Sequence, residues 1–284
     1  MKIIGGPASQ ALATRVAREM NIEPTLCEFN RFPDGEIYTR IMEEPMDEVT
    51  IIQSTTTDSD LMALLLMIDA CEDAQVVNVV IPYMGYARQD KKFKCGEPIS
   101  ARAVARAISA DRIFTVNIHK PSILNYFSSD AFDLDASEVI GKYISSLQLK
   151  DPLIVAPDTG AMTLAENTAK GVGIQYDHLE KTRLSGDTVN IKTKNMDVCG
   201  RDVVLVDDMI ATGGTMAESI KLLKSQGARE VYLACVHPVL AKNAVLRLFN
   251  AGVRDIIATD TLEKAQSSVS VASLIAGSIK NFQN

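Results

Sequence analysis

The stretch VVLVDDMIATGGT, residues 203–215, joins an apolar run directly to two carboxylates and then to a glycine turn. One interpretation is an ordinary strand-to-helix connection, in which Gly213 and Gly214 supply backbone freedom and Thr215 caps the helix. The adjacent acids Asp207 and Asp208 weaken that interpretation, because two carboxylates at a strand end would only repel each other without a ligand. The alternative is a binding loop, presented by whatever fold the rest of the chain forms.

The same succession of an apolar strand and a helix-length segment recurs along the chain. Strand-like runs lie at residues 1–4, 49–53, 76–82, 112–118, 153–157, 203–208, 230–236 and 254–259. Apolar strands that alternate with helices predict parallel sheets covered on both faces. We therefore expect an α/β protein with two tandem, doubly wound parallel-sheet domains, residues 1–145 and 146–284.

The two predicted domains share one local pattern. The segment EVTIIQSTTTDSD, residues 48–60, has the strand and threonine-rich turn of residues 202–214 but lacks carboxylates at the strand end. This similarity suggests duplicated domains, of which one kept the binding loop.

Composition excludes several classes of function. A net charge of −7 provides no electrostatic footprint for nucleic acid. The longest apolar run, residues 61–68, is too short to span a bilayer, and the first residues lack the apolar region of a signal peptide. Five cysteines without paired spacing are typical of reduced core thiols. We expect a cytoplasmic protein that binds neither nucleic acid nor membrane.

The position of the binding loop suggests its ligand. Open parallel sheets bind ligands outside the carboxyl ends of their strands, where Asp207 and Asp208 lie. Backbone N–H groups at the following helix N-terminus suit a phosphate, while the two carboxylates can accept hydrogen bonds from hydroxyls. The predicted phosphate-binding residues are Ala211, Thr212, Gly213, Gly214 and Thr215. A ligand with a phosphate at one end and a diol at the other fits both groups, as a pentose 5-phosphate does.

Further motifs occur in order along nearly the whole chain. They are RFPDGE (31–36), IPYMGYARQDKK (81–92), EPISA (97–101), IH (118–119), PDTG (157–160) and VHP (236–238). With the Asp-Asp and Thr-Gly-Gly-Thr loop, they resemble the ribose-phosphate pyrophosphokinase family, which has the type I phosphoribosyltransferase fold. The resemblance implies that ATP and ribose 5-phosphate are converted to phosphoribosyl pyrophosphate and AMP for nucleotide biosynthesis, with Mg²⁺ as cofactor.

The resemblance also implies where ATP and the metal bind. The implied ATP-binding residues are Phe32, Asp34, Gly35, Glu36, Arg88, Gln89, Asp90, Lys92 and His119. The implied metal-binding residues are His119 and Asp158. Taken alone, each group also has a simpler interpretation. Residues 32–36 would form a surface turn and residues 88–92 a solvated basic loop, while His119 would be structural and Asp158 a helix cap.

Residues 180–189, EKTRLSGDTV, read as a flexible polar loop that carries Lys181 and Arg183. Two cations in such a loop usually face solvent. In the resembling family this loop closes over the active site, and the matching cations are catalytic because they neutralise charge on the β-phosphoryl group; Arg183 also contacts ribose 5-phosphate. Transfer of this kind needs preorganised charge rather than a covalent catalyst.

Three positions depart from the family pattern. Asn117 and Ala211 stand where the family often has aspartate, which puts side-chain contacts at both positions in doubt. Leu164 stands where bacterial relatives commonly carry arginine, so regulation by phosphate or ADP through that residue is not implied.

RFPDGE lies between two strand-like runs, TLCEF and IYTRI, which predicts a protruding hairpin. In the resembling family this hairpin reaches the active site of a neighbouring subunit, which implies a homodimer or higher homo-oligomer with shared sites.

Two alternative functions stay open. A base-transferring phosphoribosyltransferase would share residues 203–215 but would need neither RFPDGE nor a second full domain. A non-catalytic regulator would be expected to lose Lys181 and Arg183.

Overall fold

The computed structural model describes residues 1–44, 47–185, 188–193 and 197–282, with the side chains of residues 181–193 left out. Contacts divide the chain into two compact units. The first is Met1–Asp135 with Thr261–Glu263 and Ser270–Asn284, and the second is Ala136–Asp260 with Lys264–Val269.

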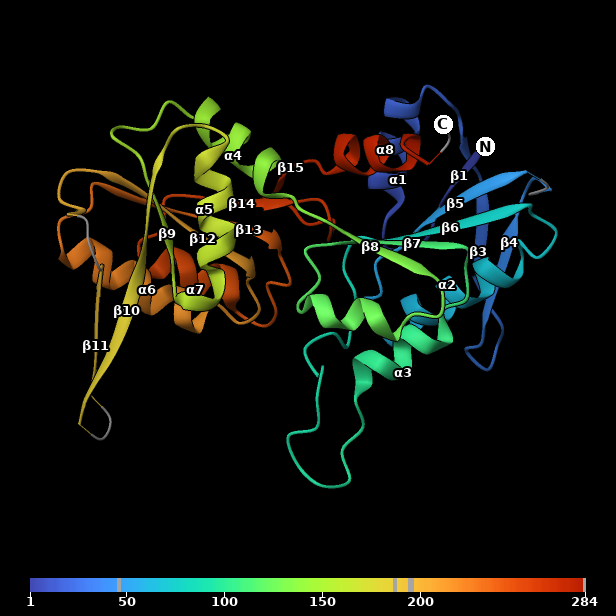
Figure 1. The fold of residues 1–284 in the computed structure, drawn as a ribbon, viewed down its shortest axis with the longest axis horizontal. Coiled ribbons are helices and arrows are strands. Elements are labelled where there is room, and N and C mark those ends of the chain that lie inside the picture. The colour runs from blue at the N-terminus through green and yellow to red at the C-terminus, as the bar shows by residue number, and fades with distance from the viewer. Residues whose placement is uncertain (45–46, 186–187, 194–196, 283–284) are drawn as a thin grey trace. The chain divides into compact units, whose positions relative to one another are not determined.

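The first unit contains a six-stranded sheet in the order β2-β1-β5-β6-β7-β8, and all its pairings are parallel. The strands are β1 (Lys2–Gly5), β2 (Pro24–Thr25), β5 (Glu48–Ile52), β6 (Val76–Ile81), β7 (Arg112–Val116) and β8 (Asp130–Leu134). Helices α1 (Gln10–Met20) and α8 (Ala272–Lys280) lie on one face, and α2 (Asp58–Asp69), α3 (Ser100–Ala107) and the 3₁₀ helix η1 (Pro121–Tyr126) lie on the other (Figure 1). A separate antiparallel hairpin consists of β3 (Cys27–Arg31) and β4 (Ile37–Ile41).

The second unit contains a seven-stranded sheet in the order β11-β10-β9-β12-β13-β14-β15. The strands are β9 (Leu153–Ala156), β10 (Gln175–Ser185), β11 (Thr188–Thr193), β12 (Asp202–Met209), β13 (Glu230–His237), β14 (Ile256–Thr259) and β15 (Ser267–Val269). Only β10 and β11 pair antiparallel. The helices are α4 (Ser137–Ser146), η2 (Thr159–Ala161), α5 (Met162–Lys170), α6 (Gly214–Ser225) and α7 (Ala244–Asn250). The predicted α/β class with two parallel sheets is confirmed.

Strand β12 shows why its sequence is apolar without alternation. Residues 202–206 are all buried, because helices cover both faces of the sheet. Leu205 packs in one core with Ile220 and Leu223 of α6. After the apolar residues 203–206, polar side chains return at Asp207, which is only half-buried.

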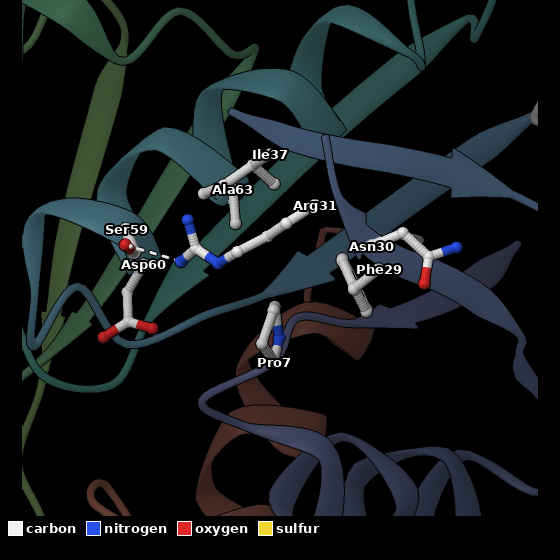
Figure 2. A pocket seen from close by; sticks show the side chains of 8 residues that line it. All are labelled: Pro7, Phe29, Asn30, Arg31, Ile37, Ser59, Asp60 and Ala63. Carbon is white, nitrogen blue, oxygen red and sulfur yellow. Dashed lines mark hydrogen bonds between the residues drawn. The ribbon is translucent and has the colours of Figure 1, made fainter. Parts of the chain in front are cut away.

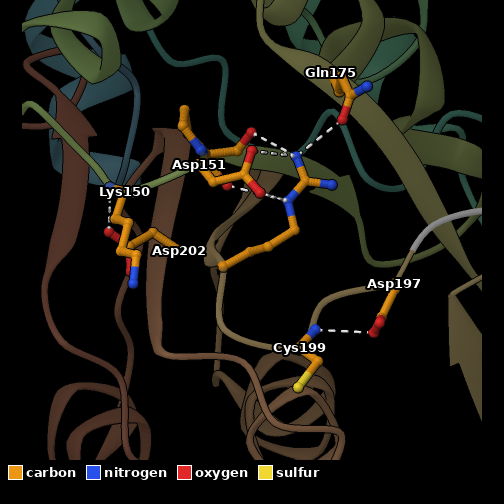
Figure 3. Close-up of polar contacts among 8 residues, drawn as sticks. Lys150, Asp151, Gln175, Asp197, Cys199 and Asp202 are labelled. Atoms are coloured by element: carbon orange, nitrogen blue, oxygen red, sulfur yellow. Dashed lines mark hydrogen bonds and ion pairs between the residues drawn. The ribbon is translucent and has the colours of Figure 1, made fainter.

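The amino-terminal edge of the second sheet is closed by polar contacts. Arg201 donates to the carbonyl of Asp151 at 3.1 Å, to that of Pro152 at 3.2 Å and to Gln175 Oε1 at 2.9 Å (Figure 3). The backbone N–H of Lys150 donates to Asp202 Oδ2 at 2.7 Å. These contacts tie together the chain ends that enter β9, β10 and β12, so the open edge for a ligand is the carboxyl edge.

The C-terminal helix α8 packs on α1 of the first unit, and Lys280 Nζ donates to the carbonyl of Glu19 at 2.8 Å. The division by contacts therefore differs from the expected one: the chain passes between units at Asp135 and Ala136, and its last residues return to the first unit. Sequence periodicity could not predict that α8 belongs to the first unit, because the apolar face of a helix does not identify the sheet on which it packs. The predicted assignment of one substrate to each domain stays a prediction.

Candidate active site

Asp207 and Asp208 lie at the carboxyl end of β12, where Asp207 is the register partner of Cys235 on β13. The backbone N–H of Asp208 donates to Asp207 Oδ1 at 2.9 Å. Burial, reinforced by the neighbouring charges of Asp208 and Asp158, raises the pKa of Asp207 to about 8. Near neutral pH the pair therefore retains a proton and offers both a donor and acceptors to hydroxyl groups.

The loop after these acids has a backbone shaped for an anion. Gly213 precedes α6 with φ of +71°, a backbone conformation that favours glycine. A Cβ there would lie 3.2 Å from side-chain atoms of Leu248, which would have to shift slightly. Within the described part of the chain, no N–H group of residues 211–215 donates a hydrogen bond to the protein. The first turn of α6 also contains no acidic residue. N–H groups that lie at a helix N-terminus, donate to no protein group and have no acidic side chain beside them are suited to bind a phosphate.

Asp158 caps η2 by accepting a hydrogen bond from the N–H of Gly160 at 2.8 Å. The plainer alternative for this residue, a helix cap, is thus present in the structure. The carboxylate is exposed, and its charge acts on Asp207 within the same unit. One residue therefore caps a helix and contributes to an acidic cluster with Asp207 and Asp208.

Lys181 and Arg183 lie on strand β10, opposite Ile191 and Val189 of β11. The expectation of a flexible loop at residues 180–189 is wrong for the backbone, because its peptide groups are paired in an antiparallel ladder. Part of that expected segment, residues 186–187, lies outside the described residues. The polar composition suggested a loop, whereas residues 180–185 pair with the next segment of the chain, β11, as a hairpin.

The predicted hairpin at residues 32–36 is present. The N–H of Phe32 donates to the carbonyl of Glu36, and Gly35 has φ of +97°. Arg31 donates to the carbonyl of Gly35 at 2.7 Å and to Ser59 Oγ at 3.0 Å, across a cavity of about 370 Å³ between the hairpin and the start of α2 (Figure 2). The Phe32 ring is 51% exposed, so it can stack on a planar group.

The segment after β6 carries Arg88, Gln89, Asp90 and Lys92 on a loop that leads to α3. Its start is fixed by a close backbone approach: a Cβ on Gly85 would lie 1.9 Å from the carbonyl oxygen of Thr55. Arg88 and Lys92 are exposed, Gln89 and Asp90 are half-buried, and Gln89 Oε1 accepts from the Ser100 hydroxyl. The two cations are thus directed to solvent, where they can meet a charged ligand.

His119 follows β7 and is half-buried. Asn117, with φ of +40°, donates through Nδ2 to Asp135 Oδ1 at 3.1 Å. Asp133 accepts from the Thr115 hydroxyl at 2.7 Å and from the N–H of Ile118 at 2.9 Å, and burial raises its pKa. Sequence reasoning missed Asp133 on β8 and Asp135 directly after it, because nothing local links residues 133–135 to the segment that follows β7.

Within the second unit, the structure brings together Asp158, Asp207, Asp208 and residues 211–215. The implied metal residues, His119 and Asp158, belong to different units, and each is placed only within its own. No group of three or more His, Cys, Asp or Glu side chains capable of holding a metal ion occurs among the described residues. No helix in the described ranges is long and apolar enough to cross a membrane.

Comparison with known proteins identifies the family. Residues 1–111 match the N-terminal domain of ribose phosphate pyrophosphokinase, and residues 122–264 match a phosphoribosyl transferase domain. The chain is 69% identical to a ribose-phosphate pyrophosphokinase of Methanosarcina acetivorans, over 99% of this chain and 100% of the relative. It is 47% identical to ribose-phosphate pyrophosphokinase 2 of Archaeoglobus fulgidus, over 98% of this chain and 100% of the relative.

A solved structure gives the same result. The chain superposes on phosphoribosylpyrophosphate synthetase from Mycobacterium smegmatis with a TM-score of 0.84 and 33% identity, covering 99% of this chain and 98% of the other. The chain therefore belongs to the ribose-phosphate pyrophosphokinase family.

Proposed function

We propose that the protein transfers the β,γ-diphosphoryl group of MgATP to the 1-hydroxyl of ribose 5-phosphate, giving phosphoribosyl pyrophosphate and AMP. Its family makes it a transferase of the kinase type. The observation that carries the assignment is the row of N–H groups at residues 211–215, unpartnered among the described residues, beside the half-buried Asp207 and Asp208.

The second unit holds ribose 5-phosphate in this proposal. The 5-phosphate binds the N–H groups of residues 211–215, and the Thr212 and Thr215 hydroxyls add donors. The diol binds Asp207 and Asp208, whose retained proton lets one carboxyl donate while the other accepts. The sugar is thereby held at both ends, which orients its 1-hydroxyl.

The first unit holds ATP. Phe32 stacks on the adenine, and Asp34, Gly35 and Glu36 on the same hairpin contact the nucleoside. Arg88, Gln89, Asp90, Lys92 and His119 follow strands β6 and β7, and the cations among them offset the negative charge of the triphosphate.

Magnesium fits the donor chemistry of the second unit. Asp158, Asp207 and Asp208 supply carboxylate oxygens. Burial and then repulsion among these charges raise the pKa of Asp207, and a divalent cation relieves such repulsion. Mg²⁺ commonly takes one or two carboxylates and completes its shell with water and substrate phosphates. We assign Asp158 and His119 as its protein ligands. When bound, the ion supplies positive charge to the phosphoryl oxygens.

The transfer requires no covalent intermediate with the protein. The 1-hydroxyl oxygen forms a bond to the β-phosphorus and loses its proton, while the bond from that phosphorus to the oxygen bridging the α-phosphorus breaks. The bridging oxygen leaves with AMP. Lys181 and Arg183 on β10 act as catalytic cations that stabilise the charge on the transferring group.

The direct test measures AMP formation from ATP, Mg²⁺ and ribose 5-phosphate. Stoichiometric AMP and phosphoribosyl pyrophosphate are expected, and at low ribose 5-phosphate the Asp207→Asn, Asp208→Asn double variant should form both about a hundredfold more slowly. Consumption of phosphoribosyl pyrophosphate with a nucleobase, and no AMP from ATP, would instead identify a base-transferring phosphoribosyltransferase.

We further propose a homo-oligomer in which the hairpin of one chain serves the active site of another. The exposed tip at Phe32 supports this, since it extends beyond the apolar packing of its own strands. Mixing an Asp34→Ala, Glu36→Ala variant with a Lys181→Ala variant should restore activity after subunit exchange. If subunits are shown to exchange and activity does not recover, the proposal that active sites are shared between chains is contradicted.

A cytoplasmic location is supported by the five cysteines, which are all free.

A further inference from the structure

The loop proposed to bind the sugar phosphate is held from behind by one continuous segment of the second unit. The N–H of Leu240 donates to the carbonyl of Ile210 at 2.8 Å, and the N–H of Ala241 donates to the carbonyl of Ala211 at 2.9 Å. Arg247 Nη1 on α7 donates to the carbonyl of Thr212 at 2.9 Å. Three consecutive carbonyls of the loop are thus fixed by residues 240–247.

Fixing a carbonyl also fixes the N–H that follows it. No cis peptide bond occurs in the described chain, and in a planar trans peptide the C=O and the next N–H point in opposite directions. Three carbonyls directed toward residues 240–247 therefore turn the N–H groups of residues 211–213 away from that segment. Those same N–H groups have no partner among the described residues.

The supporting segment is itself rigid. Leu240 packs against the core of the second unit, and Leu248 is fully buried and lies against Gly213. Leu240 and Lys242 have φ of +45° and +56°, a region that non-glycine residues rarely adopt. Such a conformation persists only where the surrounding structure imposes it, and it is often found beside functional sites.

We propose that Arg247 is a positioning residue for the anion-binding loop: its guanidinium holds the Thr212–Gly213 peptide so that the Gly213 N–H faces the phosphate. Arg247 is exposed, on a helix that begins about thirty residues beyond the loop in sequence, and belongs to none of the motifs that identify the family. This inference rests on the proposed phosphate site at residues 211–215. It adds to that site a residue that acts through the backbone rather than by touching the ligand.

Binding to the full-length chain tests the proposal by calorimetry, with ribose 5-phosphate and with inorganic phosphate as separate probes. Arg247→Ala should weaken both by about tenfold, as expected for loss of one charged hydrogen bond that orders the loop. Arg247→Lys keeps one donor and should recover part of the loss. Arg254→Ala, an equal change of charge at an exposed position in the same unit, should leave both affinities within about twofold of wild type.

Kinetics and amide spectra separate positioning from direct contact. For Arg247→Ala we expect a raised KM for ribose 5-phosphate, with kcat and the KM for ATP nearly unchanged. The ¹⁵N–¹H resonance of Gly213 should shift in the ligand-free variant, because its peptide is released. An unmoved Gly213 resonance with weakened binding would mean that Arg247 contacts the phosphate itself, and this would overturn the positioning role.

Two further outcomes also contradict the inference: wild-type affinity in Arg247→Ala, or equal losses in Arg247→Ala and Arg254→Ala. Its failure is distinguishable from failure of the proposed function. If the wild-type chain binds inorganic phosphate but not ribose 5-phosphate, the assigned substrate is wrong, while the comparison of variants with inorganic phosphate still decides the role of Arg247.

Discussion

The two units share the same strand order, but the loops after their corresponding strands β5 and β12 differ in whether their backbone N–H groups are already hydrogen-bonded to the protein. Strands β2-β1-β5-β6-β7-β8 of the first unit correspond in order to β10-β9-β12-β13-β14-β15 of the second. After β5, the N–H groups of Gln53, Ser54, Thr55 and Thr57 all donate to groups of the protein itself. After β12, the N–H groups of residues 211–215 donate to none among the described residues.

The helices that follow these loops differ in the same sense. Helix α2 begins with a capping box, in which Thr57 and Asp60 satisfy each other's backbone N–H groups, and its first turn holds Asp58 and Asp60. Helix α6 has no side-chain cap and no acid in its first turn. An anion is therefore repelled at α2 and attracted at α6. A fold supplies the position of a site, and the side chains of the loop decide whether it is open to a ligand.

The largest effect should separate the hairpin β3–β4 of the first unit from the hairpin β10–β11 of the second. Lys181→Ala on β10 should lower kcat by about a thousandfold with little change in ATP binding, because its charge is needed mainly in the transition state. Asp34→Ala with Glu36→Ala on the first hairpin should instead raise the KM for ATP. Steady-state kinetics and direct ATP binding measure both. A loss in Lys181→Ala that lay wholly in ATP affinity would make the residue a ground-state ligand.

The acids at the end of β12 should give the next largest effect. Asp207→Asn with Asp208→Asn removes one charge-assisted and one neutral hydrogen bond to the diol, at about 2 and about 1 kcal/mol, so kcat/KM for ribose 5-phosphate should fall by about a hundredfold. The matched change in the first unit is Ser54→Ala, which removes a buried hydroxyl that donates to the carbonyl of Thr261. That variant should lose stability but keep its KM for ribose 5-phosphate. Unchanged sugar affinity in the double variant would refute the diol assignment.

Gly213→Ala tests the backbone of the open loop. The added Cβ would lie 3.2 Å from Leu248, and alanine would have to adopt a φ of +71°. The loop should therefore distort, and the KM for ribose 5-phosphate should rise by about tenfold. Gly214→Ala is a suitable control, since the nearest atom to its Cβ is Arg247 Nη1 at 3.8 Å. Equal effects at both glycines would show that bulk alone, rather than the conformation of Gly213, weakens binding.

The smallest effect is expected in the closed loop of the first unit. Thr57→Ala removes the helix cap of α2 and should lower the free energy of unfolding by about 1 kcal/mol. Because the first loop binds no phosphate in this account, KM for ribose 5-phosphate should not change. Thermal unfolding and steady-state kinetics on the same preparation provide the check, and a raised sugar KM would remove the distinction between the two loops.

The sequence alone determined the fold class and the chemistry at strand ends. Apolar runs that alternate with helix-length segments predicted two parallel sheets, and RFPDGE between two strand-like runs predicted the hairpin that the structure contains at residues 32–36. The acids after residues 203–206 could be placed at a carboxyl edge, because a buried strand is recognisable from its own composition. These features depend on residues close together in the chain.

Only the tertiary structure decided what depends on distant contacts. The raised pKa of Asp207 comes first from burial in the folded unit and then from the neighbouring Asp208, with a smaller contribution from Asp158 in another loop. Helix α8 joined the first unit, where it packs on α1, which lies about 260 residues earlier in the chain. The orientation of the N–H groups at residues 211–213 depends on donors at residues 240–247. Local sequence sets which groups a loop contains, whereas the direction of each peptide is set by the atoms that the rest of the fold places behind it.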